Sequence, residues 1–133
     1  MLDGIAFANA LGDRTRWRII HLLASETLCV CELADVLKLP QSTLSSHLAI
    51  IQRAGLLTSE RRGKWMFYRV SSDVLPVLRV LYDHFDCSTK TVPMLGRDAA
   101  KASTRVARRD RDCCPGPLPQ KQSVRRSPTT KRT

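Results

Sequence analysis

The sequence lacks any apolar run of the roughly 18 residues that a membrane-spanning helix requires. Its first residues, MLDGIAFANALG, also lack the basic flank and long apolar stretch of a secretory signal. These absences argue against a membrane-bound or secreted protein, so we predict a cytoplasmic location and no membrane partner. With 133 residues, the chain is too short for two enzymatic domains, because a single domain usually needs about 100 to 150 residues.

Acidic residues are scarce in the last third of the chain. The whole sequence carries 22 Lys and Arg against 12 Asp and Glu, a formal charge of +10, which predicts an acidic partner. Residues 1–87 hold 10 basic and 9 acidic side chains, whereas residues 88–133 hold 12 and 3 and also five of the seven prolines. We therefore predict a folded domain at 1–87 and a basic, largely disordered tail at 88–133, within which 97–111 could form a polar helix.

The five cysteines lack the even spacing of a disulfide framework in a small secreted domain. They comprise a close pair, Cys29 and Cys31, an adjacent pair, Cys113 and Cys114, and the single Cys87. This pattern is more typical of cysteines whose thiols carry chemistry.

Apolar residues recur with a helical period in most of the first 87 residues. The pattern predicts helices near 2–11, 13–24, 28–37, 41–54 and 74–85, with a β-hairpin from LLTSERR and KWMFYRV that turns at Gly63. The turn at 38–40 joins the third and fourth helices in the manner of a helix-turn-helix. The fold class is therefore mostly α with a β-hairpin wing, a winged helix-turn-helix.

The outward face of the helix at 41–54 is small, polar and free of acidic residues, which suits a helix that enters the major groove of double-stranded DNA. The N-terminal half of this face and the basic tip of the hairpin supply the predicted DNA contacts: Gln41, Ser42, Thr43, Ser45, Ser46, Arg61, Arg62 and Lys64.

The first and last predicted helices are too apolar to stay exposed on so small a domain. A second copy of the chain would cover them. We therefore predict a homodimer that forms through these two helices.

The segments SSHLAIIQRAGLL (45–57) and ERRGKWMFYRV (60–70) together resemble the ArsR/SmtB family of bacterial metal-responsive repressors. The resemblance covers residues 5–87. It implies a winged helix-turn-helix homodimer that binds operator DNA and leaves it when a toxic metal or metalloid binds. The family often has Ser or Thr where this chain has Pro40, so the usual N-cap is missing and Pro40 could instead be the first residue of the helix.

Within that family, TLCVCEL (27–33) is similar to the arsenic-responsive branch. This similarity implies that Cys29 and Cys31 bind arsenite or antimonite as inducer, with no permanent cofactor. Some members have a third cysteine where this chain has Ala34. A third sulfur would then come from elsewhere, and the candidates are Cys87, Cys113 and Cys114.

Soft thiolates favour thiophilic ions over magnesium or manganese. On a regular helix, however, residues i and i+2 point about 200° apart, so Cys29 and Cys31 could share one ion only if the first turn of the 28–37 helix unwound. This conflict would couple the inducer to DNA binding, because the same helix opens the DNA-binding motif.

Three other functions stay open from the sequence. The thiols could sense oxidants or another soft metal, or the chain could bind DNA constitutively. An enzyme of arsenic chemistry is less favoured, because a phosphatase-like reductase loop needs arginine six residues after its cysteine and no cysteine here has one.

Overall fold

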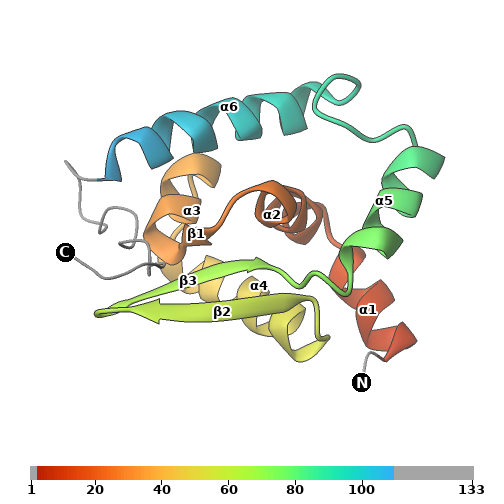
Figure 1. Cartoon of the computed structure of the whole chain (residues 1–133), viewed down its shortest axis with the longest axis horizontal. Helices are drawn as coiled ribbons and strands as arrows, with labels where there is room; N and C mark the ends of the chain where they lie inside the picture. The colour runs from red at the N-terminus through yellow and green to blue at the C-terminus, as the bar shows by residue number, and fades with distance from the viewer. Residues whose placement is uncertain (1–2, 110–133) are drawn as a thin grey trace, which may run out of the picture.

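The computed structural model describes residues 3–109. In that part of the chain, helices dominate and one three-stranded antiparallel sheet lies among them (Figure 1). The elements follow in this order: α1 (Gly4–Leu11), α2 (Arg14–Ser25), β1 (Leu28–Cys29), α3 (Val30–Leu37), α4 (Gln41–Arg53), β2 (Leu57–Arg62), β3 (Trp65–Val70), α5 (Leu75–His84) and α6 (Pro93–Ala107). The mostly helical fold with a β-hairpin, predicted from periodicity, is confirmed.

The core lies between α2, α3 and α4 and the sheet. Its buried side chains come from the apolar positions that recur at helical spacing, and they include Ile19, Ile20, Leu33, Leu44, Leu48, Ile51 and Leu56. The same packing fixes α3 against α4, so the helix-turn-helix is held as a unit.

Short polar residues begin the first two helices as expected. The carboxylate of Asp3 accepts a hydrogen bond from the Ile5 N–H, and that of Asp13 accepts one from the Arg16 N–H. Pro40 is the N-cap of α4 and not its first helical residue, because its ψ of 146° is extended and the helix begins at Gln41. The expected polar cap of α5 is also absent, since Val74 holds the N-cap position without a side-chain hydrogen bond.

The hairpin of β2 and β3 turns tightly. Arg62 pairs with Trp65, which leaves Gly63 and Lys64 as the two loop residues. Gly63 has a φ of +62°, a left-handed conformation that favours glycine. The predicted wing is therefore formed, with a basic residue at its tip.

The sequence-based boundary at Leu28 is wrong. Leu28 and Cys29 are not helical but form β1, which pairs with Tyr68 and Phe67 of β3. The fully buried Leu28 and Phe67 explain the difference, because packing against the wing outweighs a helical propensity that is weak at a helix end. Helix α3 starts only at Val30.

The stretch after Cys87 also differs from a polar, disordered tail in its described part, residues 88–109. Helix α6 packs along α2 and α3 (Figure 1), with Leu95 and Ala102 buried. Its buried Asp98 accepts two hydrogen bonds of 2.9 Å from the Arg18 guanidinium of α2. The predicted disorder beyond residue 113 lies outside the described residues.

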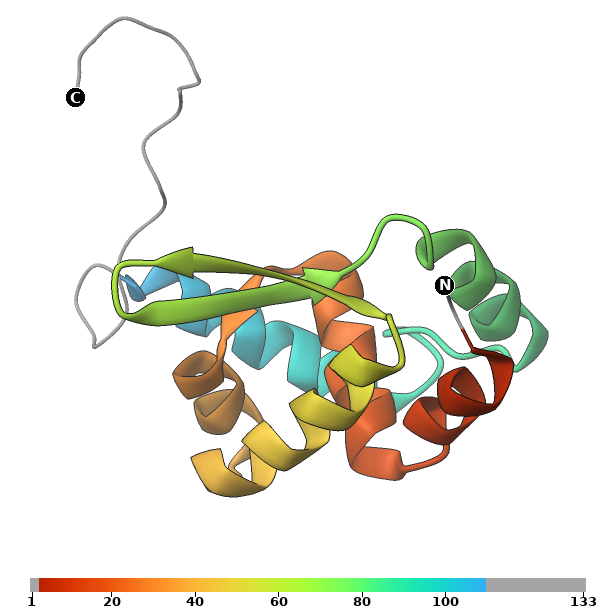
Figure 2. The ribbon, with the colours of Figure 1, turned by 90° about the horizontal axis from the view of Figure 1, so that it is seen from below.

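Helices α1 and α5 lie side by side at the end of the molecule away from the wing tip (Figure 2). They leave several large apolar side chains in solvent: Ile5, Val77, Val80 and Phe85. A shallow hollow lined by Phe7, Leu11, Leu81 and Phe85 separates the two helices. Of the described helices, none is long and apolar enough to cross a membrane.

Candidate functional site

Cys29 and Cys31 lie together at the junction of β1 and α3. Cys29 is the last residue of β1 and the N-cap of α3, and Cys31 is in the first turn of that helix. Their Sγ atoms are 3.0 Å apart. Two sulfurs at this separation can bind one thiophilic ion together.

The expected geometric conflict between the two cysteines is therefore wrong. It assumed a regular helix through both residues, but Cys29 has φ −92° and ψ 172°, which is extended backbone. The change from strand to helix between the two residues turns both sulfurs to the same side. No unwinding of α3 is needed for them to share a ligand.

Glu32 holds this junction in place from the buried side. Its carboxylate, with the side chain fully buried, accepts a hydrogen bond of 3.1 Å from the Cys29 N–H. This arrangement is a capping box, in which the third residue of the helix reaches back to the N-cap backbone. The backbone at Cys29 is thus fixed independently of any ligand.

Arg109 neutralises Glu32. Its Nε donates to Glu32 Oε2 at 2.6 Å and its Nη2 to Oε1 at 3.1 Å, while Nη2 also donates to the Thr27 carbonyl oxygen. The guanidinium lies 5.2 Å from the centre of the Phe67 ring. The residue just beyond α6 is thereby fastened beside the cysteine pair.

Burial keeps Cys29 in its thiol form. It raises the pKa of the Cys29 thiol, and the hydrogen bond from the Glu32 backbone opposes this only in part. A protonated, buried thiol is a weak nucleophile toward oxidants. It remains a suitable partner for a ligand that exchanges hydroxide for sulfur.

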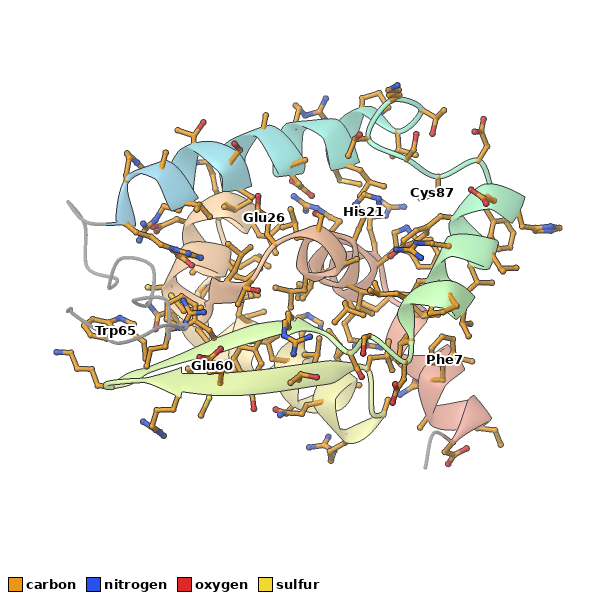
Figure 3. The ribbon with its side chains drawn as sticks, viewed as in Figure 1. Phe7, His21, Glu26, Glu60, Trp65 and Cys87 are labelled. Atoms are coloured by element: carbon orange, nitrogen blue, oxygen red, sulfur yellow. The ribbon has the colours of Figure 1, made fainter. Side chains whose placement is uncertain are left out.

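A cavity of about 530 Å³ opens beside the two cysteines. Its walls also include Gln41, the first residue of α4, and Lys64, Trp65 and Met66 of the wing. Trp65 is labelled at the hairpin end of the molecule in Figure 3. The cavity therefore touches both elements that are predicted to contact DNA.

The predicted contact face of α4 is open to solvent. Its polar residues are all exposed, while Leu44, Leu48 and Ile51 on the other side are buried: Gln41, Ser42, Thr43, Ser45 and Ser46. The face is small and uncharged, because Ser46 Oγ donates to the Ser42 carbonyl oxygen at 3.2 Å and adds no bulk.

The three basic residues of the wing are not equivalent. Arg61 and Lys64 are exposed. Arg62 is less available, because its guanidinium lies 4.4 Å from the centre of the Phe67 ring and 3.5 Å from Glu60, and 14% of its side chain is exposed. To contact DNA, Arg62 would have to leave the Phe67 ring.

Cys87 is not near the cysteine pair within one protomer. Its Sγ accepts a hydrogen bond of 3.3 Å from Trp17 Nε1, and Figure 3 shows it at the end of the molecule away from Trp65. It packs in an aromatic cluster in which Trp17 meets Tyr82 edge to face. Cys113 and Cys114 lie outside the described residues.

Sequence reasoning missed Glu32 and Arg109. The spacing of Glu32, three residues after the N-cap, is the signal of a capping box and could have identified it. Arg109 gave no local signal, since its partner lies 77 residues away. His47 is likewise explained only by the fold, because its Nδ1 lies 3.3 Å from Arg16 Nη1 of α2.

Comparison with known proteins identifies the family. Residues 13–59 match the model of the bacterial regulatory proteins of the arsR family. The chain is also 33% identical over 99 residues to the arsenical resistance operon repressor of Escherichia coli, a match that covers 73% of this chain and 85% of that protein. The chain belongs to the ArsR family. The resemblance predicted from residues 45–57 and 60–70 is thus confirmed.

Solved structures of ArsR-like regulators share the fold. HlyU from Vibrio cholerae is 30% identical, with a TM-score of 0.56, and the match covers 61% of this chain and 89% of HlyU. A homodimeric winged helix-turn-helix DNA-binding domain from Mycobacterium bovis has a TM-score of 0.56 at 24% identity, covering 62% of this chain and 76% of that one. The winged helix-turn-helix is confirmed for this ArsR-family transcriptional regulator.

Proposed function

We propose that this ArsR-family regulator is a repressor of a metalloid-resistance operon that leaves its operator when arsenite or antimonite binds Cys29 and Cys31. The observation that carries the proposal is the 3.0 Å separation of the two Sγ atoms beside a cavity that reaches α4 and the wing. Thiolates are soft donors and suit trivalent arsenic and antimony.

The cavity supports a direct coupling between inducer and DNA. An ion on the two sulfurs lies between Gln41 at the start of α4 and Lys64 at the wing tip, both of which are exposed. An occupied cavity displaces these side chains from the positions they need on DNA. By linkage, DNA then weakens inducer binding by the same factor by which inducer weakens DNA binding.

The DNA contacts divide by chemistry. The polar face of α4 (Gln41, Ser42, Thr43, Ser45 and Ser46) reads base edges and phosphates, and the wing residues Arg61 and Lys64 bind phosphates. Arg62 joins them only if DNA draws it from Phe67. We assign DNA binding and dimerisation to residues 1–87, with α6 packed on that domain and the basic residues of 88–133 adding non-specific affinity.

The active species is a homodimer formed through α1 and α5. The exposed Ile5, Val80 and Phe85 support this, since an isolated monomer rarely exposes a continuous apolar patch. The two recognition helices of such a dimer would meet two half-sites of a palindromic operator. The cytoplasmic location stays a prediction.

A titration tests the proposal. A DNA duplex selected by the wild-type protein from random sequences is bound in a mobility-shift experiment, and arsenite, antimonite, cadmium, zinc and peroxide are added separately. Arsenite and antimonite should lower the DNA affinity of the wild type at least tenfold and leave Cys29→Ser/Cys31→Ser unchanged.

The matched control is Cys87→Ser, which should respond as the wild type does. If the double serine variant still releases DNA with arsenite, the inducer binds elsewhere and the proposal is wrong. A response to peroxide alone would favour the thiol redox sensor instead. No response to any of them would favour a constitutive DNA-binding protein.

A further inference from the structure

We propose that the chain beyond α6 completes the inducer site, with Cys113 or Cys114 of the same chain as the third sulfur ligand of arsenite bound to Cys29 and Cys31. This inference rests on the proposed function and assigns the third donor, which the family comparison leaves open.

The chemistry of arsenite calls for three sulfurs. Arsenious acid carries three hydroxyl groups, and each can be exchanged for a thiol. In each exchange an As–S bond forms and an As–O bond breaks, and the hydroxyl leaves with the thiol proton as water. One arsenious acid and three thiols therefore give one tris-thiolate and three waters, with arsenic trivalent throughout. Two cysteines complete only two of these exchanges.

Within residues 3–109, nothing supplies the third thiol. Cys87 is held by Trp17 at the other end of the protomer (Figure 3). In the same residues no group of three or more His, Cys, Asp or Glu side chains is placed to hold an ion. Of the five cysteines in the sequence, only Cys113 and Cys114 are left as donors from the same chain.

Arg109 brings the following residues to the cysteine pair. Its guanidinium binds the carboxylate of Glu32 through two hydrogen bonds, and the same carboxylate binds the Cys29 N–H. It also binds the Thr27 carbonyl oxygen, two residues before Cys29. These contacts are buried, with the Arg109 side chain 9% exposed. The last described residue of the chain is therefore anchored within one carboxylate of the inducer site.

The remaining distance is short. Cys113 follows Arg109 by four residues and Cys114 by five. An extended chain spans at most about 3.6 Å per residue, or roughly 14 to 18 Å over this segment. The cavity of about 530 Å³ beside Cys29 and Cys31 has room for an arsenic atom and one more side chain. Either cysteine can thus reach the pair without moving α6.

The number of sulfur ligands tests the inference. Reduced full-length protein is loaded with one equivalent of arsenite, and arsenic X-ray absorption counts the sulfur neighbours. We expect three in the wild type and in Cys87→Ser. We expect two sulfurs and one oxygen in Cys113→Ser/Cys114→Ser, with arsenite binding weakened at least about tenfold, because an intramolecular ligand acts at a high effective concentration.

Arg109→Ala tests the anchor separately. It should weaken arsenite binding when Cys113 and Cys114 are present, but should have no further effect on arsenite binding in Cys113→Ser/Cys114→Ser. Circular dichroism confirms that each variant is folded before the comparison is made, and Arg109→Lys replaces any variant that is not.

The outcomes separate this inference from the proposed function. Three sulfurs in Cys113→Ser/Cys114→Ser, two sulfurs in the wild type, or a loss of the third sulfur in Cys87→Ser would each overturn the third-ligand assignment while leaving Cys29 and Cys31 as the inducer site. Unchanged arsenite affinity in Cys29→Ser/Cys31→Ser would overturn the proposed function itself.

Discussion

At the scale of single residues, Glu32 has two tasks. Its carboxylate caps the backbone at Cys29 and neutralises the buried Arg109. A buried ion pair adds little net stability by itself, but removing one partner leaves an uncompensated charge away from water. Glu32 therefore links the stability of the fold to the shape of the cysteine site.

Glu32→Gln should lower the free energy of unfolding by about 3 kcal/mol, because Arg109 keeps its charge in a buried position. The amide still offers an oxygen to the Cys29 N–H, so the loss reports the charge and not the cap. Urea unfolding followed by circular dichroism measures it. The matched control is Glu60→Gln, whose carboxylate is 48% exposed beside Arg62 and should cost less than about 1 kcal/mol. Equal losses in the two variants would contradict the buried role of Glu32.

The raised pKa of Cys29 predicts different pH dependences for two inducers. Neutral arsenious acid reacts with a protonated thiol and releases water, so arsenite affinity should be flat between about pH 6 and 8. Cadmium must displace the thiol protons, so its affinity should rise with pH by about tenfold per unit for each proton released. Because burial raises the Cys29 pKa, this rise should continue above the usual thiol range. Calorimetric titrations in a pH series measure both, and parallel slopes for the two ions would refute the assignment.

At the scale of secondary-structure elements, the wing combines structural and DNA-binding roles. Arg61 and Lys64 are exposed, whereas Arg62 packs on Phe67. Phe67 also pairs with Cys29 across the sheet. The hairpin thus supports the cysteine site with one face and offers charge to DNA with the other.

Arg61→Ala and Lys64→Ala should each reduce the slope of log affinity against log salt by about one, since each removes one phosphate contact. Their stability should stay within about 0.5 kcal/mol of the wild type, as is usual for surface changes. Arg62→Ala should show the opposite pattern, with lower stability and a slope close to that of the wild type. DNA binding at several salt concentrations and thermal unfolding distinguish the three. An equal change in slope for all three variants would show that Arg62 leaves Phe67 on DNA.

Sequence reasoning located most elements because their signals are local. The periodic apolar residues and Asp13 predicted α2, and Gly63 predicted the turn of the wing. The strand at Leu28 and Cys29 could not be predicted, because its partner Phe67 is 38 residues away along the chain. The same holds for α6, which sequence analysis treated as a polar helix in a tail. Its stable position depends on Arg18 of α2, 80 residues from Asp98, and a long-range ion pair leaves no pattern in a single sequence.

At the scale of the whole molecule, the two ends have different roles. The wing, α3 and α4 form the end with the cysteine pair, and α1 and α5 form the apolar end (Figure 2). A dimer through α1 and α5 would place its two inducer sites far from the interface. Inducer would then act within each protomer on the DNA contacts and would not need to separate the subunits.

Val80→Glu should convert the dimer to a monomer, because it places a charge on a side chain that is 67% exposed in the proposed interface. Analytical ultracentrifugation measures the change in mass, and DNA affinity should fall at least tenfold as the two half-sites lose their link. Ser103→Glu, at an exposed position of α6, is the control and should stay dimeric. A wild type that is monomeric at micromolar concentration would contradict the interface.

The placement of the two tryptophans has a practical consequence. Trp65 lines the cysteine cavity with Lys64 Nζ 5.0 Å from the centre of its ring, whereas Trp17 is bonded to Cys87 at the far end. A heavy atom on Cys29 and Cys31 would quench the emission of Trp65 and leave that of Trp17 nearly unaltered. In Trp17→Phe the intrinsic fluorescence would therefore come from the inducer site alone, so this protein carries its own optical readout of occupancy and needs no attached dye.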